Sequence, residues 1–92
     1  MQSHTEHVRF YEKYREYIDS CTEVRSIEIA NFTGRYSDVD DYRQEIRLYI
    51  FQKITQYQPE HAKPHTFINL LAVTAKRKML RRLRKETNNH AR

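Results

Sequence analysis

Residues 66–85 read TFINLLAVTAKRKMLRRLRK, and this stretch decides the fold because its apolar residues recur every three or four positions. Its first half can pack into a core as a helix, whereas its second half carries seven cations and no acidic residue. These cations are Lys76, Arg77, Lys78, Arg81, Arg82, Arg84 and Lys85. Such a helix can bury one face and present positive charge to a polyanion with the rest. The pattern favours nucleic-acid binding over catalysis.

The composition predicts one domain spanning residues 1–92, with frayed ends at 1–5 and 87–92. The chain has 17 Lys and Arg against 12 Asp and Glu, a formal net charge of +5 that favours phosphate backbones or acidic proteins as partners. Cys21 is the single cysteine, so an internal disulfide is impossible and a reducing cytoplasm is the expected location. We expect no membrane association, since no apolar run approaches the length of a span.

The rest of the chain also has helical periodicity and no strand-like alternation. We expect helical structure over about residues 6–33, ended by Gly34, as either two helices or one helix with a weak joint at Ser20-Cys21-Thr22. Ser37 is the expected N-cap of a second helix that reaches Tyr57. This helix places Val39, Tyr42, Ile46, Tyr49, Ile50, Ile54 and Tyr57 on one side.

A loop between Pro59 and Pro64 then precedes the basic helix, which we expect to begin at His65 or Thr66. The predicted fold is all-α, a compact bundle of three or four helices.

Several short patterns occur in a fixed order along the chain. They are Asp41-Tyr42-Arg43-Gln44-Glu45 after the Gly34 turn, Tyr57-Gln58-Pro59-Glu60, Phe67-Ile68 and Leu80-Arg81-Arg82. This order resembles region 2 of bacterial RNA polymerase sigma factors, especially the extracytoplasmic-function type and its phage-related relatives. The resemblance implies a helical bundle of the sigma region 2 type.

The sequence departs from this pattern in four places. Tyr42 replaces the Leu of the acidic motif, and Pro64 replaces an aromatic residue of the loop. His61-Ala62 replaces the Arg-Gly that follows Pro-Glu in the family, and Val73-Thr74 replaces an Arg-Asn pair in the last helix. The chain also stops soon after region 2, so the helix-turn-helix domain that recognises the distal promoter element is not part of it. We expect either an excised fragment or a natural single-domain relative.

The resemblance implies that the middle helix docks on the clamp helices of the largest subunit of core RNA polymerase. The matching positions are Asp38, Asp41, Gln44, Glu45 and Leu48. The last four are spaced i, i+3, i+4 and i+7, which puts them on one side of a helix, next to the buried stripe. The alternative is that the aspartates only cap the helix while Glu45 is solvated.

The resemblance also implies that the loop and last helix bind and melt the −10 promoter element as single-stranded DNA. The candidate DNA-binding residues are Tyr57, His61, His65, Asn69, Lys76, Arg77, Arg81 and Arg82. Single strands are held by cationic grooves and by surfaces on which bases stack. The alternatives are a solvated basic helix and, for Tyr57 and Phe67, packing in the core.

Other kinds of site have little support in the sequence. His61 and His65 are separated by Pro64 and lack a Cys or carboxylate pair to complete a metal site. Cys21 is expected to be a small buried apolar residue. We therefore expect no enzyme activity, metal or cofactor.

Two further functions remain open. One is a small basic DNA- or RNA-binding regulatory protein without polymerase contact. The other is a mimic of region 2 that captures a sigma partner or an anti-sigma factor. An anti-sigma factor could equally be a partner of a sigma-like module.

Overall fold

The computed structural model describes the backbone of residues 4–90 and the side chains of residues 7–86. Within this part there are four α-helices, two short 3₁₀ turns and no strand, which confirms the predicted all-α class. The elements are α1 (His4–Lys13), α2 (Arg15–Thr33), η1 (Tyr36–Asp38), α3 (Val39–Lys53), η2 (Ile54–Gln56) and α4 (Pro64–His90). Of the ends expected to fray, 1–3 and 91–92 lie outside the described residues, while 4–5 and 87–90 have helical backbone.

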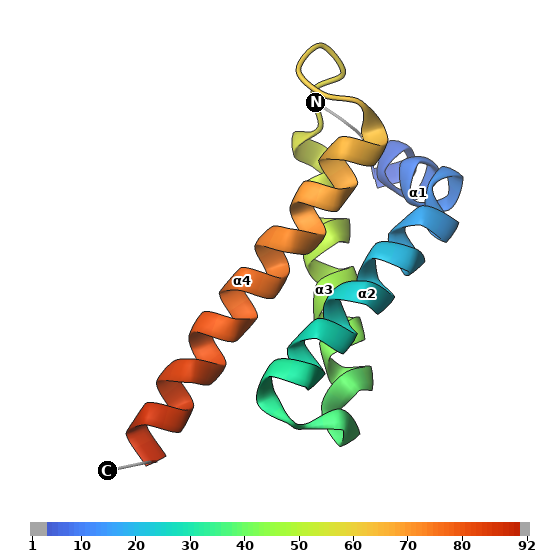
Figure 1. Cartoon of the computed structure of the whole chain (residues 1–92). Helices are drawn as coiled ribbons and strands as arrows, with labels where there is room; N and C mark the ends of the chain where they lie inside the picture. The colour runs from blue at the N-terminus through green and yellow to red at the C-terminus, as the bar shows by residue number, and fades with distance from the viewer. Residues whose placement is uncertain (1–3, 91–92) are drawn as a thin grey trace.

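Helices α2, α3 and α4 form an elongated bundle whose long axis measures 47 Å (Figure 1). Side-chain contacts give the directions of the helices. Asp19 and Glu23 of α2 pair with Arg47 and Arg43 of α3, so these neighbours are antiparallel. Tyr17 and Glu28 of α2 contact His65 and Lys76 of α4, so α2 and α4 run in the same direction. Helix α1 contacts the end of the bundle at which η2 lies.

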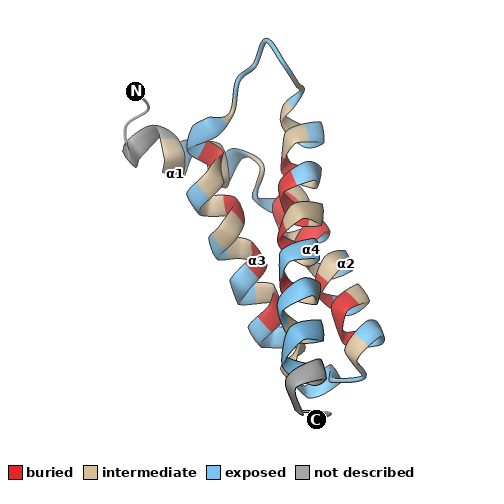
Figure 2. Ribbon diagram, turned by 90° about the vertical axis from the view of Figure 1, so that its left-hand side faces the viewer, coloured by how far each residue is buried: buried red, intermediate tan, exposed pale blue. Residues whose placement is uncertain are grey.

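The core lies where the three long helices face one another (Figure 2), and isoleucine is its commonest residue. Its fully buried large side chains are Ile18, Ile29, Ile46, Ile50, Ile54 and Ile68. Tyr42, Ile46, Ile50 and Ile54 are buried as the spacing in the middle helix predicted. On α4 the buried residues described are Ile68, Leu71, Ala72, Ala75 and Met79, and Leu80 and Leu83 pack partly buried against the core, so the apolar face continues among the cations.

The first helical segment bends at Tyr14, and the expected joint at Ser20-Cys21-Thr22 is wrong. Tyr14 has φ −108° and ψ 18°, while the backbone hydrogen bonds from Tyr14 to Phe10 and from Ile18 to Tyr14 continue through the bend. Cys21 and Thr22 lie inside α2 and are buried against the other helices. Packing therefore outweighs their low helix propensity.

The predicted end of this segment at Gly34 is confirmed. Gly34 has φ +74°, in the left-handed region, and its N–H donates to the carbonyl of Ala30 at 2.8 Å. Glycine suits this position because a Cβ atom disfavours the left-handed conformation.

We expect Gly34→Ala to lower the free energy of unfolding by roughly 1 kcal/mol. No atom lies within 4 Å of the position that a Cβ would take, so the loss comes from the backbone conformation alone. Gly34→Asn is the control, because asparagine tolerates this region better and should cost less. Urea unfolding measures both; an alanine variant as stable as the parent would show that the turn does not depend on a left-handed residue.

The entry into α3 also differs from the prediction, since Ser37 is not its N-cap. Ser37 lies in η1, and Asp38 holds the N-cap position without a side-chain capping hydrogen bond. The preceding turn is closed instead by the N–H of Asp38 donating to Arg35 and by the hydroxyl of Tyr36 donating to Asn31. Asp40 and Asp41 occupy the first turn of α3, as expected.

The other helix ends are shifted slightly from the prediction. Helix α3 ends at Lys53 and continues as η2, so Tyr57 lies beyond it in extended backbone. Helix α4 begins at Pro64, a residue before the predicted start. Proline is favourable in a first helical turn because the N–H it lacks would have no partner in the helix.

Candidate functional site

One exposed surface of the bundle is the side of α3 that points away from the core. Asp41, Gln44, Glu45 and Leu48 are all exposed on it, and Leu48 retains 56% of its accessible surface. We call these four residues the α3 strip. Asp38, the fifth residue of the predicted set, is half-buried in η1. The strip combines carboxylates, an amide and an apolar side chain, which suits a protein partner with a basic and partly apolar surface.

The carboxylates at the start of α3 do not act as side-chain caps, because no capping hydrogen bond is present at Asp38 among the described residues. Asp40 is bound by Arg43, which also donates to both carboxylate oxygens of Glu23 at 2.5 and 2.8 Å. The hydrogen bond from Arg43 holds the pKa of Glu23 below its ordinary value. Arg43 thus ties α3 to α2, while Asp41 remains exposed.

Tyr57 lies at the opposite end of the bundle and is anchored within its own loop. Its hydroxyl donates to the carbonyl of Ala62 at 2.9 Å. Its ring lies between Phe10 and Phe67, with centroids 5.3 and 5.1 Å away. Burial raises the pKa of the Tyr57 hydroxyl. These contacts favour packing over base stacking for Tyr57 and Phe67, the alternative that the sequence left open.

The other predicted loop residues are more accessible. His61 is exposed, and its backbone N–H closes the turn by donating to the backbone carbonyl of Gln58 at 3.0 Å. His65 is exposed too, with its ring edge-on to Tyr17 at 4.5 Å and to Tyr14 at 5.5 Å. Asn69 follows one turn later and is half-buried. The loop end therefore offers two exposed imidazole groups, of which aromatic rings hold that of His65 in place.

The cations of α4 divide into paired and free groups. Lys76 donates to Glu28 at 3.1 Å, and Arg82 donates to Glu45. Arg77 and Arg81 are exposed and form no ion pair with any side chain of residues 7–86. The free pair lies on one side of the helix at i and i+4, where it can contact a polyanion.

Two further cations of α4 lie over aromatic rings. The Nζ of Lys78 is 5.1 Å from the ring centre of Tyr49, and the guanidinium of Arg84 is 5.5 Å from that of Phe32. Phe32 and Tyr36 are exposed by 58% and 61%. The basic end of α4 thus lies close to aromatic rings on both α2 and α3, a feature that no sequence pattern predicted.

Glu28 of α2 forms an ion pair with Lys76 and so connects α2 to α4. Burial raises its pKa, but the hydrogen bonds from Lys76 and Arg25 outweigh burial and hold the pKa below its ordinary value. Glu28 is therefore charged at neutral pH and partly neutralises Lys76. Of the predicted cations, Lys76 is consequently less available to phosphate than Arg77 or Arg81.

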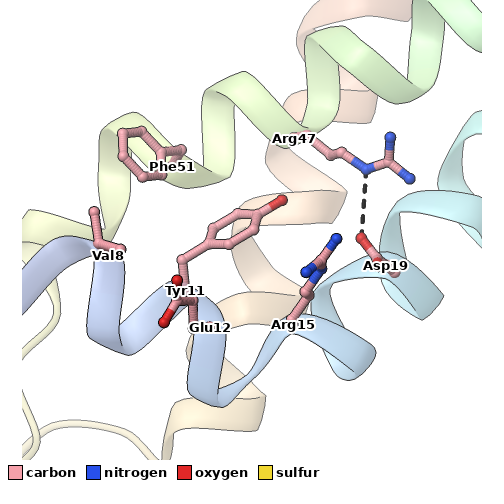
Figure 3. A pocket seen from close by; sticks show the side chains of 7 residues that line it. All are labelled: Val8, Tyr11, Glu12, Arg15, Asp19, Arg47 and Phe51. Atoms are coloured by element: carbon pink, nitrogen blue, oxygen red, sulfur yellow. Dashed lines mark ion pairs between the residues drawn. The ribbon is translucent and has the colours of Figure 1, made fainter.

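A hollow of about 360 Å³ lies where α1, α2 and α3 meet (Figure 3). It is lined by Val8, Tyr11, Glu12, Arg15, Asp19, Arg47 and Phe51, none of which has a predicted role. Arg47 and Asp19 form an ion pair of 3.4 Å across it. Burial raises the pKa of Tyr11, and Asp19 raises it further. The hollow depends on residues from three helices, so no local sequence pattern could indicate it.

Two other kinds of feature are absent from the described residues. No group of His, Cys, Asp and Glu side chains in this part of the chain is arranged to hold a metal ion. None of the described helices is long and apolar enough to cross a lipid bilayer.

The fold is that of a small helical module whose exposed α3 strip suits a basic protein surface and whose free arginines on α4 suit a polyanion. Comparison with protein families narrows this class, since residues 25–89 match Sigma-70 region 2. The match covers well over half of the chain, and the chain therefore belongs to the sigma-70 region 2 family. Members of this family bind core RNA polymerase and promoter DNA and are not enzymes. Comparisons with curated proteins and with solved structures find no significant match.

Proposed function

We propose that this chain is a sigma factor-like module of transcription initiation. In this proposal the α3 strip, together with Asp38, docks on the clamp helices of the largest subunit of core RNA polymerase. The loop and α4 then bind the −10 promoter element as it melts, through His61, His65, Asn69 and the α4 cations, with Tyr57 shaping the loop. The chain acts in the cytoplasm with its polymerase, and an anti-sigma factor is a further proposed partner.

One observation carries the proposal: the α3 strip is exposed and separate from the free arginines of α4. Because Tyr42, Ile46 and Ile50 anchor α3 in the core, the strip is held on a rigid element. A protein and a nucleic acid can therefore bind different surfaces of the bundle at the same time. Charge complementarity at each surface would help to select its partner.

Leu48 provides the test of docking. We expect Leu48→Ala to weaken binding to core polymerase about tenfold, since burying the exposed part of a leucine side chain in an interface is worth about 1 kcal/mol or more. Ile27→Ala is the matched control, because Ile27 is a similarly exposed apolar residue on α2, outside both proposed surfaces. Fluorescence anisotropy or surface plasmon resonance with purified core polymerase measures both. Equal affinity of the two variants for polymerase would contradict docking through the strip.

A second function, nucleic-acid binding without polymerase contact, is favoured by the free Arg77 and Arg81. These arginines can bind phosphates of any sequence in a salt-dependent manner. Competition between single-stranded −10 DNA and a duplex of the same sequence separates the two functions. A preference for the single strand supports promoter melting, and a preference for duplex supports the general binder.

A further inference from the structure

Arg82 lies between the two proposed surfaces. It projects from α4 among the cations, yet its Nη2 atom donates to both carboxylate oxygens of Glu45, at 3.0 and 2.9 Å. Glu45 belongs to the α3 strip. A cation of the nucleic-acid surface is therefore held by a carboxylate of the protein-docking surface, across 37 positions of sequence.

The pair closes one edge of a groove of about 430 Å³ between α3 and α4. The groove is lined by Glu45, Leu48, Tyr49, Gln52, Ala75, Lys78, Met79 and Arg82. Glu45 is the only acidic residue of this lining. The other cation, Lys78, lies over the ring of Tyr49, so Glu45 acts mainly on Arg82.

The pair is strong enough to form and weak enough to be displaced. Both side chains are substantially exposed, Arg82 by 53% and Glu45 by 43%, and exposed ion pairs contribute little net stability. Carboxylate and phosphate oxygens use the same guanidinium N–H donors. While Nη2 is held by Glu45, a phosphate can use only the remaining donors of Arg82, whose charge Glu45 partly neutralises.

We infer that Glu45 competes with nucleic-acid phosphate for Arg82 and so lowers the affinity of the free chain for single-stranded nucleic acid. This inference rests on the DNA-binding part of the proposed function. A chain with a net charge of +5 meets an excess of non-specific polyanions in a cell. An internal carboxylate on one of its exposed cations reduces that background binding.

The test measures the binding of short single-stranded DNA by fluorescence anisotropy, without polymerase. Four proteins are compared: the parent, Glu45→Gln, Arg82→Gln and the double variant. We expect Glu45→Gln to raise affinity roughly two- to fivefold at low salt, the range that an exposed ion pair can supply. The gain should shrink as salt is added, because salt screens exposed charges.

Removing any acidic residue makes the chain more positive, so the design needs two controls for net charge. Glu16→Gln removes a charge from an exposed residue of α2 and should raise affinity less than Glu45→Gln. In the Arg82→Gln background, Glu45→Gln should raise the affinity for DNA little, because the guanidinium that Glu45 and phosphate compete for is absent. Circular dichroism verifies that all variants are folded.

The outcomes separate the two hypotheses. An equal gain from Glu45→Gln with and without Arg82, or no gain at all, overturns the competition and leaves DNA binding intact. Failure of all proteins, parent included, to bind the single strand overturns the DNA-binding proposal and the competition with it.

Discussion

Replacing Ile46 by alanine is expected to lower the free energy of unfolding by about 2–5 kcal/mol, the usual range for truncating a fully buried isoleucine. Ile46 is 0% exposed and lies near the middle of α3, in the core between the three long helices. A domain of this size has a total stability of about 5–15 kcal/mol, so the loss is a large fraction of it.

Chemical denaturation followed by circular dichroism measures this loss. Ile27→Ala is again the control, because the same atoms are removed from a side chain that is 42% exposed. We expect it to cost well under half as much, since little apolar surface returns to water. Similar losses for both variants would mean that α3 is not held in the bundle through Ile46.

Removing the free arginines should have the largest effect on nucleic-acid binding. For the double variant Arg77→Gln, Arg81→Gln, we expect affinity for single-stranded DNA to fall about 25-fold at 0.1 M salt. The salt slope, which is the slope of log affinity against log salt concentration, should become shallower by about 1.4, because each phosphate contact on a single strand contributes about 0.7. The physical reason is that each arginine on a phosphate releases bound counterions.

The control is the double variant Arg9→Gln, Arg35→Gln, which changes net charge equally at exposed positions outside the proposed site. It should leave the salt slope nearly unchanged. Anisotropy titrations at several salt concentrations give both slopes. A parallel decrease in the two double variants would show that net charge, and not contact with Arg77 and Arg81, governs binding.

Features that depend on local chemistry could be predicted from the sequence. Gly34 ends α2 because a left-handed residue is needed there, and the buried stripe of α3 follows from helical spacing alone. The exposure of Gln44 and Leu48 follows from the same spacing. Membership of the sigma-70 region 2 family, which the order of short motifs indicated, is confirmed by the match over residues 25–89.

Features that depend on distant residues could not be predicted. Cys21 and Thr22 remain helical because other helices cover them, and no neighbouring residue indicates this. The pairing of Arg82 with Glu45 requires knowledge of how α3 crosses α4. The assignments of single residues to polymerase or DNA stay predictions until the binding experiments are done.

The continuity of α4 has a geometric consequence for any promoter that the chain engages. After Pro64 no proline or glycine interrupts the helix, so His65 and Arg84 are held about 28 Å apart by the helical rise of 1.5 Å per residue. That length corresponds to about eight base-pair steps of duplex DNA. The helix therefore fixes the distance between the loop and the arginines. Inserting one residue in its middle would rotate the arginines by about 100° relative to the loop.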